Sequence, residues 1–473
     1  MDSKQFREYA HQVVDWMADY LETIESRPVC SPVEPGEIFA QLPENPPAKG
    51  EDFQRIMADL DRVIMPGITH WQHPGFFAYF PANSSPPSVL AEMITATLGA
   101  QCMIWQTSPA AAELEERVMS WLGQMIGLPD GFQGVIQDTA STATLAAILT
   151  AREKRTGYAV NREGLQGQAP LVVYASGETH SSIEKAVKIA GLGRKNLRVI
   201  PVDEAFAMQA AALDAAIGAD LEAGRQPLCV VATLGTTGST AMDPLADIAE
   251  ICRRRKVWLH VDAAYAGSAF LLPEMRHFLK GVEQVDSLVF NPHKWLLTNF
   301  DCSAYFVRDP EALVRTFEIL PEYLKTAADS AVKNYRDWGI PLGRRFRALK
   351  LWFVIRSYGV EGLQAVLRRQ MALSRNLRDT MEADGRFEIL APLSLNLLCF
   401  RFRPAGMPEG EALDSLNRRL LEGLNNTGEL YLTHTRLRGQ YTLRLVCGQL
   451  RTEERHIEQA WAAIRLIAES LQG

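Results

Sequence analysis

Short apolar runs alternate with helix-like segments through the middle of this 473-residue chain. From about residue 110 onward, the apolar runs are separated by segments whose apolar residues recur at helical spacing. The runs are mostly unbroken, which indicates strands whose two faces are both covered by helices. This order is typical of an α/β domain built on a mostly parallel sheet. Ligands of such sheets bind beside the carboxyl ends of the strands.

The pattern predicts bounds for these elements. Strands are expected at 171–175, 197–201, 228–233, 257–262, 287–291 and 304–307. Helices are expected at 111–126, 142–154, 182–191, 209–223 and 244–255. A long helix at 342–358 then leads to a smaller α+β region, with helices at 360–384, 411–424 and 452–471 and strands at 395–402 and 441–446. We therefore divide the chain into residues 1–95, 96–360 and 361–473.

The first fifty residues do not continue this pattern. Residues 5–24 predict an amphipathic helix whose apolar stripe runs from Phe6 to Ile24. Residues 28–49 contain six prolines and no periodicity, so we expect an extended segment there. A terminal helix cannot bury its stripe alone, so it must pack on the body of the protein or on a partner subunit.

Composition excludes several classes of function. The net charge of −7 gives no reason to expect binding to nucleic acid or to an anionic membrane. The seven cysteines are scattered, which excludes a zinc ribbon or a disulfide framework and fits a reducing cytoplasm. We expect no signal peptide and no membrane span, because charges begin at Asp2 and no apolar run approaches ~20 residues. His70 and His73 lack a third ligand nearby, so we expect no metal site.

Lys294 and Asp262 are the strongest candidates for chemistry. Lys294 lies in Asn-Pro-His-Lys-Trp just after one apolar run, and Asp262 ends another. An amine in apolar surroundings loses proton affinity and becomes nucleophilic toward an aldehyde. A buried carboxylate can pair with the pyridinium nitrogen of pyridoxal phosphate (PLP). Taken singly, a surface lysine and a helix-capping or ion-paired aspartate are ordinary alternatives, but together the two residues suggest a PLP site.

Three further segments could complete such a site. Residues 137–142 open a helix with small hydroxyl residues, which suits a phosphate, although an ordinary capped helix has the same pattern. Residues 235–238, Gly-Thr-Thr-Gly, follow a strand and could line the same rim. His180 also follows a strand, where it could stack on a ring or carry a proton near neutral pH; a structural histidine is the alternative.

These motifs resemble those of the group II PLP-dependent decarboxylases, most closely the aromatic-L-amino-acid (DOPA) decarboxylases. The resemblance covers residues 135–148, 174–186, 231–243, 258–270 and 290–304, and extends along nearly the whole chain. His-Val-Asp-Ala-Ala-Tyr and Asn-Pro-His-Lys-Trp occur in order and at the family's spacing. The resemblance implies a fold-type I PLP enzyme: a large seven-stranded α/β domain, a small C-terminal domain, and an N-terminal arm exchanged across a homodimer.

The resemblance also assigns roles to residues. It implies that Lys294 carries PLP, that Asp262 pairs with its ring nitrogen, and that His180 stacks on the ring and touches substrate. The rest of the implied cofactor site comprises Ala140, Ser141, Thr237, Ala264, Asn291 and His293. Tyr323 matches the family tyrosine on a lid, the proposed proton donor to the substrate Cα.

Other matched positions concern the substrate. By resemblance the ring pocket is walled by Trp71, Tyr79, Phe80 and, from the partner subunit, Met103 and Trp105. Gly343 matches the glycine that aromatic decarboxylases have at this position, whereas the similar histidine decarboxylases have serine there. Ala82 departs from the threonine whose hydroxyl contacts the substrate carboxylate in mammalian DOPA decarboxylases, and Met103 replaces a phenylalanine.

The expected activity is therefore decarboxylation of an aromatic L-amino acid (DOPA, tyrosine, 5-hydroxytryptophan or tryptophan) to its amine and CO2. One alternative is a PLP-dependent aldehyde synthase, against which Tyr323 argues, because those enzymes have phenylalanine there. A decarboxylase of another amino acid, such as histidine, is a second. A catalytically silent scaffold is a third, but it would be expected to lose Lys294, Asp262 or His180.

Overall fold

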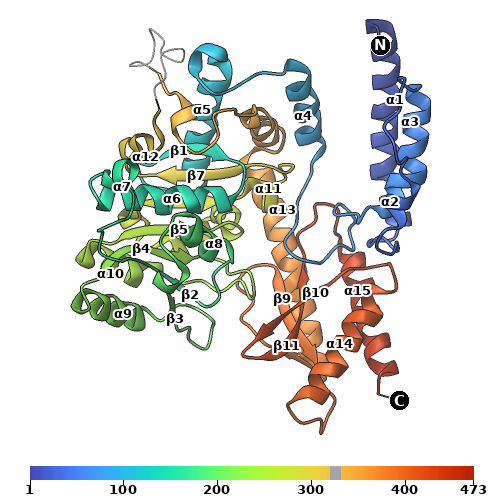
Figure 1. The fold of residues 1–473 in the computed structure, drawn as a ribbon. Coiled ribbons are helices and arrows are strands. Elements are labelled where there is room, and N and C mark those ends of the chain that lie inside the picture. Colours follow the sequence, from blue (N-terminus) through green and yellow to red (C-terminus); the bar gives the residue numbers. More distant parts are fainter. Residues whose placement is uncertain (320–331, 473) are drawn as a thin grey trace. The chain divides into compact units, whose positions relative to one another are not determined.

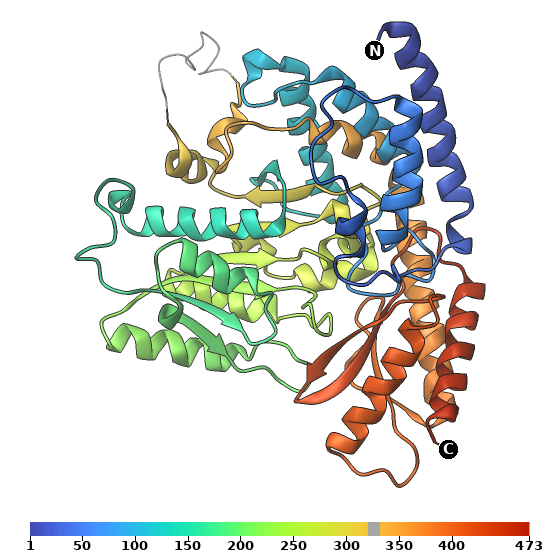
Figure 2. The ribbon, with the colours of Figure 1, turned by 45° about the vertical axis from the view of Figure 1, so that its right-hand side comes forward.

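The computed structural model describes residues 1–319 and 332–472, which divide into two compact units. The first unit comprises residues 1–81, 376–388 and 400–473, and the second comprises 82–375 and 389–399. Figures 1 and 2 show the course of the chain through both units. The division into 1–95, 96–360 and 361–473 stays a prediction.

A seven-stranded sheet forms the centre of the second unit (Figure 1). Its strands lie in the order β1-β7-β6-β5-β4-β2-β3. They are β1 (Gln133–Gln137), β2 (Leu171–Ser176), β3 (Leu197–Ile200), β4 (Gln226–Thr233), β5 (Trp258–Asp262), β6 (Ser287–Phe290) and β7 (Ser303–Val307). Strands β3, β2, β4, β5 and β6 pair in parallel, whereas β7 pairs antiparallel with β6 and with β1. The predicted mostly parallel α/β sheet is confirmed.

Helices cover both faces of this sheet, as the unbroken apolar strands require. On one face α6 (Ala140–Arg155) and α8 (Ser182–Ile189) bury their apolar residues against Val173, Val231 and Val289. On the other face the Tyr174 hydroxyl donates to Asp220 of α9 (Ala210–Glu222) at 2.9 Å. With α10 (Leu245–Arg255) beside α9, the sheet forms the middle layer of three.

The remaining elements of the second unit connect these layers. The α-helices are α4 (Pro86–Leu98), α5 (Pro109–Ile126), α7 (Ala159–Glu163), α11 (Pro292–Trp295) and α12 (Pro310–Phe317). Short 3-10 helices occur at Trp105–Thr107, Arg194–Asn196, Ala266–Leu271, Pro273–Leu279, Val282–Gln284 and Tyr335–Asp337. Gly267 shows how tightly these segments pack, because a Cβ built there would lie 2.2 Å from the Cβ of Phe290.

The first unit contains the N-terminal helices and a four-stranded sheet. The helices are α1 (Ser3–Glu22), α2 (Glu37–Gln41), α3 (Phe53–Asp59), α14 (Glu411–Asn425) and α15 (Glu454–Ser470), with 3-10 or π turns at Ile24–Ser26, Leu60–Ile64 and Met65–Gly67. The sheet order is β10-β11-β9-β8, with β8 (Phe387–Ile389), β9 (Leu397–Phe402), β10 (Thr433–Leu437) and β11 (Gln440–Val446). The division between the units falls within β8 and β9 and within α13 (Arg347–Asp384).

Two sequence predictions are wrong in detail. The helix expected from residue 342 begins later, at Arg347. The predicted break between residues 358 and 360 is confirmed, because Gly359 has non-helical backbone angles, with φ of 63°, and divides α13 into two helices that meet at a kink. Gly343 helps to explain the late start, because glycine disfavours a helix interior. The segment 28–49 is not extended throughout, since α2 forms within it after Gly36 adopts a left-handed conformation with φ of 96°.

Helix α1 is confirmed, and its first turn is capped by Asp2, which accepts from the backbone N–H groups of Lys4 and Gln5. None of its residues is fully buried. Across the residues that the structure describes, no helix is both long and apolar enough to cross a membrane.

Candidate active site

Lys294 lies just beyond the carboxyl end of β6, in the four-residue helix α11. Its backbone N–H donates to the Asn291 carbonyl at 2.9 Å, and its own carbonyl accepts from the Asn83 amide at 3.0 Å. Burial lowers the pKa of the Lys294 ammonium, while the Asp262 carboxylate acts to raise it. The net lowering favours the neutral amine, which is the nucleophilic form.

Aromatic packing fixes the helix that carries Lys294. Trp295 stacks on Tyr265 with ring centroids 4.8 Å apart, and its indole N–H donates to Gln370 of α13 at 2.6 Å. The Tyr265 hydroxyl in turn donates to the Asn396 side chain at 2.8 Å. Because all these groups are buried and paired, the lysine projects from a rigid base.

Asn291 and His293, on either side of Pro292, are fixed by hydrogen bonds to residues at the start of β7. The His293 ring accepts the Cys302 N–H at Nδ1 (2.9 Å), which places the proton of the neutral ring on Nε2. Burial lowers the pKa of His293 to about 3, so the ring is neutral at physiological pH. Asn291 accepts the Ser303 hydroxyl at Oδ1 (2.5 Å), which orients its amide N–H groups as the available donors.

Asp262 is the last residue of β5 and lies between β4 and β6, opposite Thr233 and Val289. The side chain is buried, and its Oδ1 accepts the Ala264 N–H at 3.0 Å. The Ala264 carbonyl then accepts the Asn291 N–H at 3.0 Å, which ties the Asp262 turn to the Lys294 turn. The two candidates thus follow neighbouring parallel strands at the sheet edge where ligands bind.

His180 follows β2 and belongs to the same electrostatic site. Its Nδ1 accepts the Ser182 N–H at 3.2 Å and lies 2.8 Å from the Ser182 hydroxyl. Burial lowers the pKa of His180, the Lys294 ammonium lowers it further, and the Asp262 carboxylate opposes both. The structure therefore brings together His180, Lys294 and Asp262 from three strand ends.

The amino terminus of α6 offers an anion site at this edge. Thr139 caps the helix by accepting the Thr142 N–H at 3.4 Å, and Ala140 and Ser141 are the first two helical residues. Their backbone N–H groups have no partner within the helix, and the helix dipole favours negative charge there. Thr144 of the same helix lies 3.2 Å from the His260 ring of β5, which links the anion site to the strand of Asp262.

Thr237 lies in the loop after β4. The loop is held from within, because the Thr236 hydroxyl accepts the Ala241 N–H at 3.0 Å. Thr237 itself is exposed, at the carboxyl end of the strand that neighbours β5.

Among the predicted substrate residues, Met103 and Gly343 lie close to each other although they are far apart in sequence. The Cys102 N–H donates to the Arg344 carbonyl at 3.0 Å, and the Arg336 N–H donates to the Met103 carbonyl at 2.8 Å. Trp105 belongs to the same wall, where its N–H donates to Asn334 at 3.0 Å.

The other predicted substrate residues fall in three places. Ala82 adjoins Asn83, which contacts the Lys294 carbonyl. In the first unit Trp71 stacks on Tyr79 with centroids 5.8 Å apart, and Phe80 lies 5.5 Å from the Arg444 guanidinium. Tyr323 lies outside the described residues.

Several residues that shape this site were missed by the sequence analysis. They are Asn83, Ser182, Tyr265, Cys302, Ser303, Gln370 and Asn396. Asn83 had a weak signal, because it opens a polar run directly after an aromatic segment. Gln370 and Asn396 had none, since an isolated amide in a helix or loop does not reveal a distant partner.

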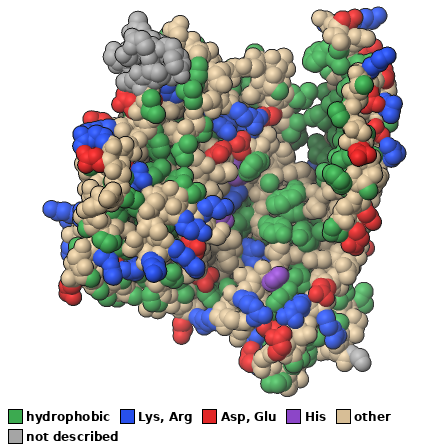
Figure 3. All heavy atoms as spheres, viewed as in Figure 1, with side chains coloured by type: hydrophobic (Ala, Val, Ile, Leu, Met, Phe, Trp, Pro, Cys, Tyr) green, Lys and Arg blue, Asp and Glu red, His purple; other side chains and the backbone are tan. Residues whose placement is uncertain are grey.

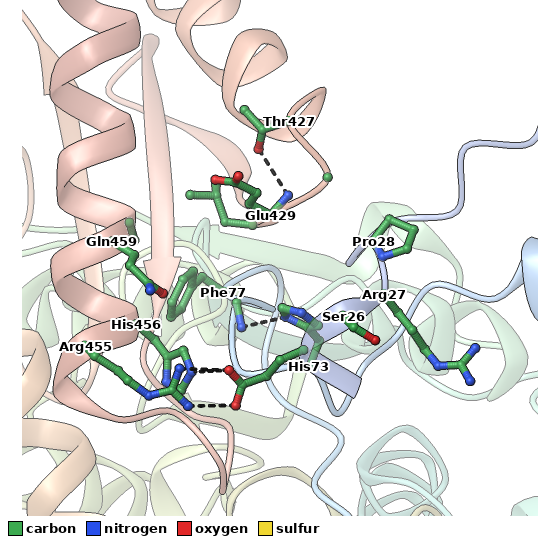
Figure 4. A pocket seen from close by; sticks show the side chains of 15 residues that line it. Ser26, Arg27, Pro28, His73, Phe77, Thr427, Glu429, Arg455, His456 and Gln459 are labelled. Carbon is green, nitrogen blue, oxygen red and sulfur yellow. Dashed lines mark hydrogen bonds and ion pairs between the residues drawn. The ribbon is translucent and has the colours of Figure 1, made fainter. Parts of the chain in front are cut away.

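The first unit has a cavity of its own, of about 660 Å³ (Figure 4). At its edge Glu25 accepts from both terminal nitrogens of Arg455 at 2.8 Å, and the His456 ring lies 3.3 Å from the same carboxylate. Arg455 holds the pKa of Glu25 down at about 2, so the pair is charged at neutral pH. The cavity contains none of the predicted site residues. Among the described residues no cluster of metal-ligating side chains occurs.

A lysine of lowered pKa, a buried carboxylate at the next strand end and a helix amino terminus are the groups that a PLP site requires. The donor set fits the aldehyde, the ring nitrogen and the phosphate of this cofactor in turn. Comparison with known proteins agrees: the chain belongs to the pyridoxal-dependent decarboxylase family, whose conserved domain matches residues 35–403. Its cofactor is PLP and its fold is that of fold-type I.

Three similar proteins show how far the likeness extends. The aromatic-L-amino-acid decarboxylase of Sus scrofa is 45% identical over 100% of this chain and 98% of its own length. The phenylacetaldehyde synthase of Arabidopsis thaliana is 44% identical over 98% of this chain and 96% of its own. A crystal structure of Oryza sativa TDC with PLP and tryptamine superposes with a TM-score of 0.97 at 39% identity, covering 100% of this chain and 99% of that one.

Proposed function

We propose that this PLP-dependent enzyme decarboxylates aromatic L-amino acids to their amines and CO2. One observation carries the proposal: Lys294 and Asp262 follow neighbouring parallel strands at the carboxyl edge of the sheet, in turns joined by the hydrogen bond from the Asn291 N–H to the Ala264 carbonyl, and His180 follows β2 of the same sheet. The 45% identity with the aromatic-L-amino-acid decarboxylase of Sus scrofa supports an aromatic substrate. DOPA, tyrosine, 5-hydroxytryptophan and tryptophan are the candidates.

The proposed roles follow the geometry. Lys294 anchors the cofactor through its neutral amine, and Asp262 keeps the ring nitrogen protonated. The phosphate is bound at the amino terminus of α6 by Ala140 and Ser141, with the Asn291 amide as a further donor. His293, Thr237 and Ala264 complete the cofactor site. When bound, PLP supplies an electron-withdrawing ring that accepts the electron pair left as CO2 departs.

The proposed substrate contacts start with His180. His180 donates its Nε2 proton toward the substrate, because its Nδ1 is occupied by Ser182. Trp71, Tyr79 and Phe80 wall the aromatic ring, together with Met103 and Trp105 from the partner subunit. Gly343 leaves room for it, since the three atoms nearest to a Cβ built there would all belong to the Gln101 side chain, the closest at 3.4 Å. Ala82 offers no hydroxyl to the substrate carboxylate, so that contact differs from the mammalian pattern.

Tyr323 is the proposed proton donor to the substrate Cα. An aldehyde synthase is the second candidate function, favoured by the 44% identity with the phenylacetaldehyde synthase of Arabidopsis thaliana. Tyr323 supports the decarboxylase, and Tyr323→Phe is expected to yield aldehyde in place of amine.

We also propose that the enzyme is a cytoplasmic homodimer. On the N-terminal helices, hydrophobic side chains gather along one side and charged side chains along the other (Figure 3). Phe6 and Val14 of α1 are exposed in the single chain. In the second unit Leu90, Ile94 and Leu98 form an exposed stripe on α4 at four-residue spacing. All seven cysteines are free, as in proteins of a reducing compartment.

The test is an assay of purified enzyme with PLP and a panel of amino acids, including histidine. CO2 and amine are expected in equal amounts from at least one aromatic substrate and not from Lys294→Ala. Aldehyde, hydrogen peroxide and ammonia would instead indicate the synthase. Activity that survives in Lys294→Ala would contradict the proposed site.

A further inference from the structure

The Gln101 side chain lies beside the space that Gly343 leaves open. A Cβ built on Gly343 would lie 3.4 Å from the Gln101 amide nitrogen, Nε2, and the other nearest atoms belong to the same side chain. Any substrate ring that uses the space at Gly343 therefore meets this amide.

Hydrogen bonds fix which end of the amide faces that space. The Gln101 Oε1 accepts the Arg344 N–H at 2.6 Å, so the carbonyl oxygen must be the atom nearest the backbone donor. The two Nε2 hydrogens are left, and no hydrogen-bond partner for them occurs among the residues that the structure describes. The backbone of Gln101 is also held, because its main-chain carbonyl accepts the Thr107 hydroxyl at 2.7 Å.

The surrounding wall is rigid enough to aim the amide. The Arg344 guanidinium is buried and donates to both oxygens of Glu115, at 2.6 and 3.1 Å, and to the Ile136 carbonyl at 2.9 Å. The Arg344 backbone carbonyl also accepts the Cys102 N–H, so Arg344 and Cys102, the two neighbours of Gln101, are both anchored.

We propose that Gln101 is a specificity residue that donates a hydrogen bond to a hydroxyl group on the substrate ring. This inference rests on the proposed function and narrows it to ring-hydroxylated aromatic amino acids. A phenolic oxygen at this place satisfies the Nε2 donor, whereas an unsubstituted ring leaves the donor without a partner and displaces its water. The enzyme discriminates between two substrates by binding their transition states with different free energies, and the ratio of their kcat/KM values measures this difference.

The experiment compares kcat/KM for two pairs of substrates, tyrosine with phenylalanine and 5-hydroxytryptophan with tryptophan. The holoenzyme is expected to prefer the hydroxylated member of at least one pair by about tenfold or more. Gln101→Met keeps the length of the side chain and removes the donor, so this preference should fall toward one. Within a pair, general damage to the fold lowers both rates and leaves their ratio unchanged.

Thr107→Val is the matched control. It removes the other hydrogen bond that holds Gln101 but leaves the amide in place, so it should keep the ratio of the wild type even if both rates fall. Three outcomes would each overturn the inference while leaving the proposed decarboxylase activity intact. The wild type could show equal kcat/KM within both pairs, or Gln101→Met could keep the wild-type ratio of kcat/KM. The third outcome is that Thr107→Val loses the preference as fully as Gln101→Met. Absence of CO2 from all four substrates would overturn the proposed function, and the inference with it.

Discussion

Asp262 acts on its surroundings mainly through charge. Its buried carboxylate raises the pKa of the Lys294 ammonium and that of the His180 ring, against the lowering effect of burial. The same carboxylate is the proposed partner of the cofactor's ring nitrogen. A neutral side chain at this position therefore changes three groups at once, although it leaves the backbone hydrogen bonds of the turn in place.

Asp262→Asn is accordingly expected to lower kcat by about 10²–10³-fold, the usual scale for loss of a preorganised charge in a closed site. The measurement is steady-state decarboxylation with saturating PLP, together with PLP affinity by fluorescence. Asp286→Asn is the matched control, because the half-buried Asp286 carboxylate also accepts a backbone N–H, that of Leu259 at 2.8 Å, but lies just before the amino end of β6. Similar losses of kcat in the two variants would show that Asp262 is only structural.

Two glycines allow a contrast between fit and function. The three atoms nearest to a Cβ at Gly343 belong to the Gln101 side chain and lie at 3.4 Å or more, whereas a Cβ at Gly267 would overlap Phe290. Gly343→Ala is therefore expected to change the free energy of unfolding by less than about 0.5 kcal/mol, and Gly267→Ala to lower it by about 1–3 kcal/mol or more.

Although Gly343→Ala is expected to have little effect on stability, we expect it to have a clear effect on activity. Gly343→Ala should lower kcat/KM for the preferred aromatic substrate by about tenfold, because a methyl group enters the proposed ring space. Urea unfolding and substrate assays on the same preparations check both expectations. A fully active Gly343→Ala enzyme would exclude this glycine from the substrate pocket.

At the scale of elements, α4 has a face that the single chain leaves uncovered. Leu90, Ile94 and Leu98 lie one helical turn apart, and each is exposed. Glu92 of the same helix instead points to the buried Lys350 ammonium, 3.0 Å away, so the helix is anchored on its other side. The stripe is therefore available to a second copy of the chain.

Ile94→Glu is expected to convert the proposed dimer into single chains, because a carboxylate cannot be buried in an apolar interface without a partner. Sedimentation analysis of the holoenzyme measures the change in mass. Ile189→Glu is the control, since Ile189 is exposed at the end of α8, outside this stripe. An unchanged mass for Ile94→Glu would exclude α4 from the interface.

Elements differed in how well the sequence predicted them. Strands β2 to β7 were predicted because most of them are unbroken apolar runs, and their order placed Lys294 and Asp262 at one edge of the sheet. Strand β1 was missed, because Gln133, Gly134 and Gln137 make its pattern weak and its antiparallel pairing with β7 comes from a segment 170 residues away. The same reason hides Gln370 and Asn396, whose importance lies wholly in tertiary contacts.

At the scale of the whole molecule, buried histidines set how stability changes with pH. Burial lowers the pKa of His73 and His260 to about 4 and that of His293 to about 3. In the unfolded chain each titrates near 6.5. Below this pH the histidines bind protons in the unfolded chain but stay neutral in the folded chain. Their contribution to the free energy of unfolding is therefore complete above about pH 6.5 and decreases as the pH drops toward about 4.

One buried carboxylate opposes this trend. Burial raises the pKa of Asp243 to about 6, even though it accepts the N–H groups of Thr233 and Met208 at 2.7 Å. Between about pH 6 and 4 the folded chain binds this proton before the unfolded chain does, which adds stability on acidification. Each group changes the free energy of unfolding by at most about 1.4 kcal/mol per pH unit, so Asp243 offsets about one of the three histidines.

The holoenzyme is therefore expected to lose a few kcal/mol of unfolding free energy between pH 7 and pH 5, with the loss beginning below about 6.5. Urea unfolding at constant PLP and ionic strength measures the slope. In His260→Asn the slope should decrease by up to about 1.4 kcal/mol per pH unit, whatever the variant's stability at pH 7. In the control His277→Asn it should not change, because His277 is exposed. A slope in His260→Asn equal to that of the wild type would show that His260 is not held neutral in the folded protein.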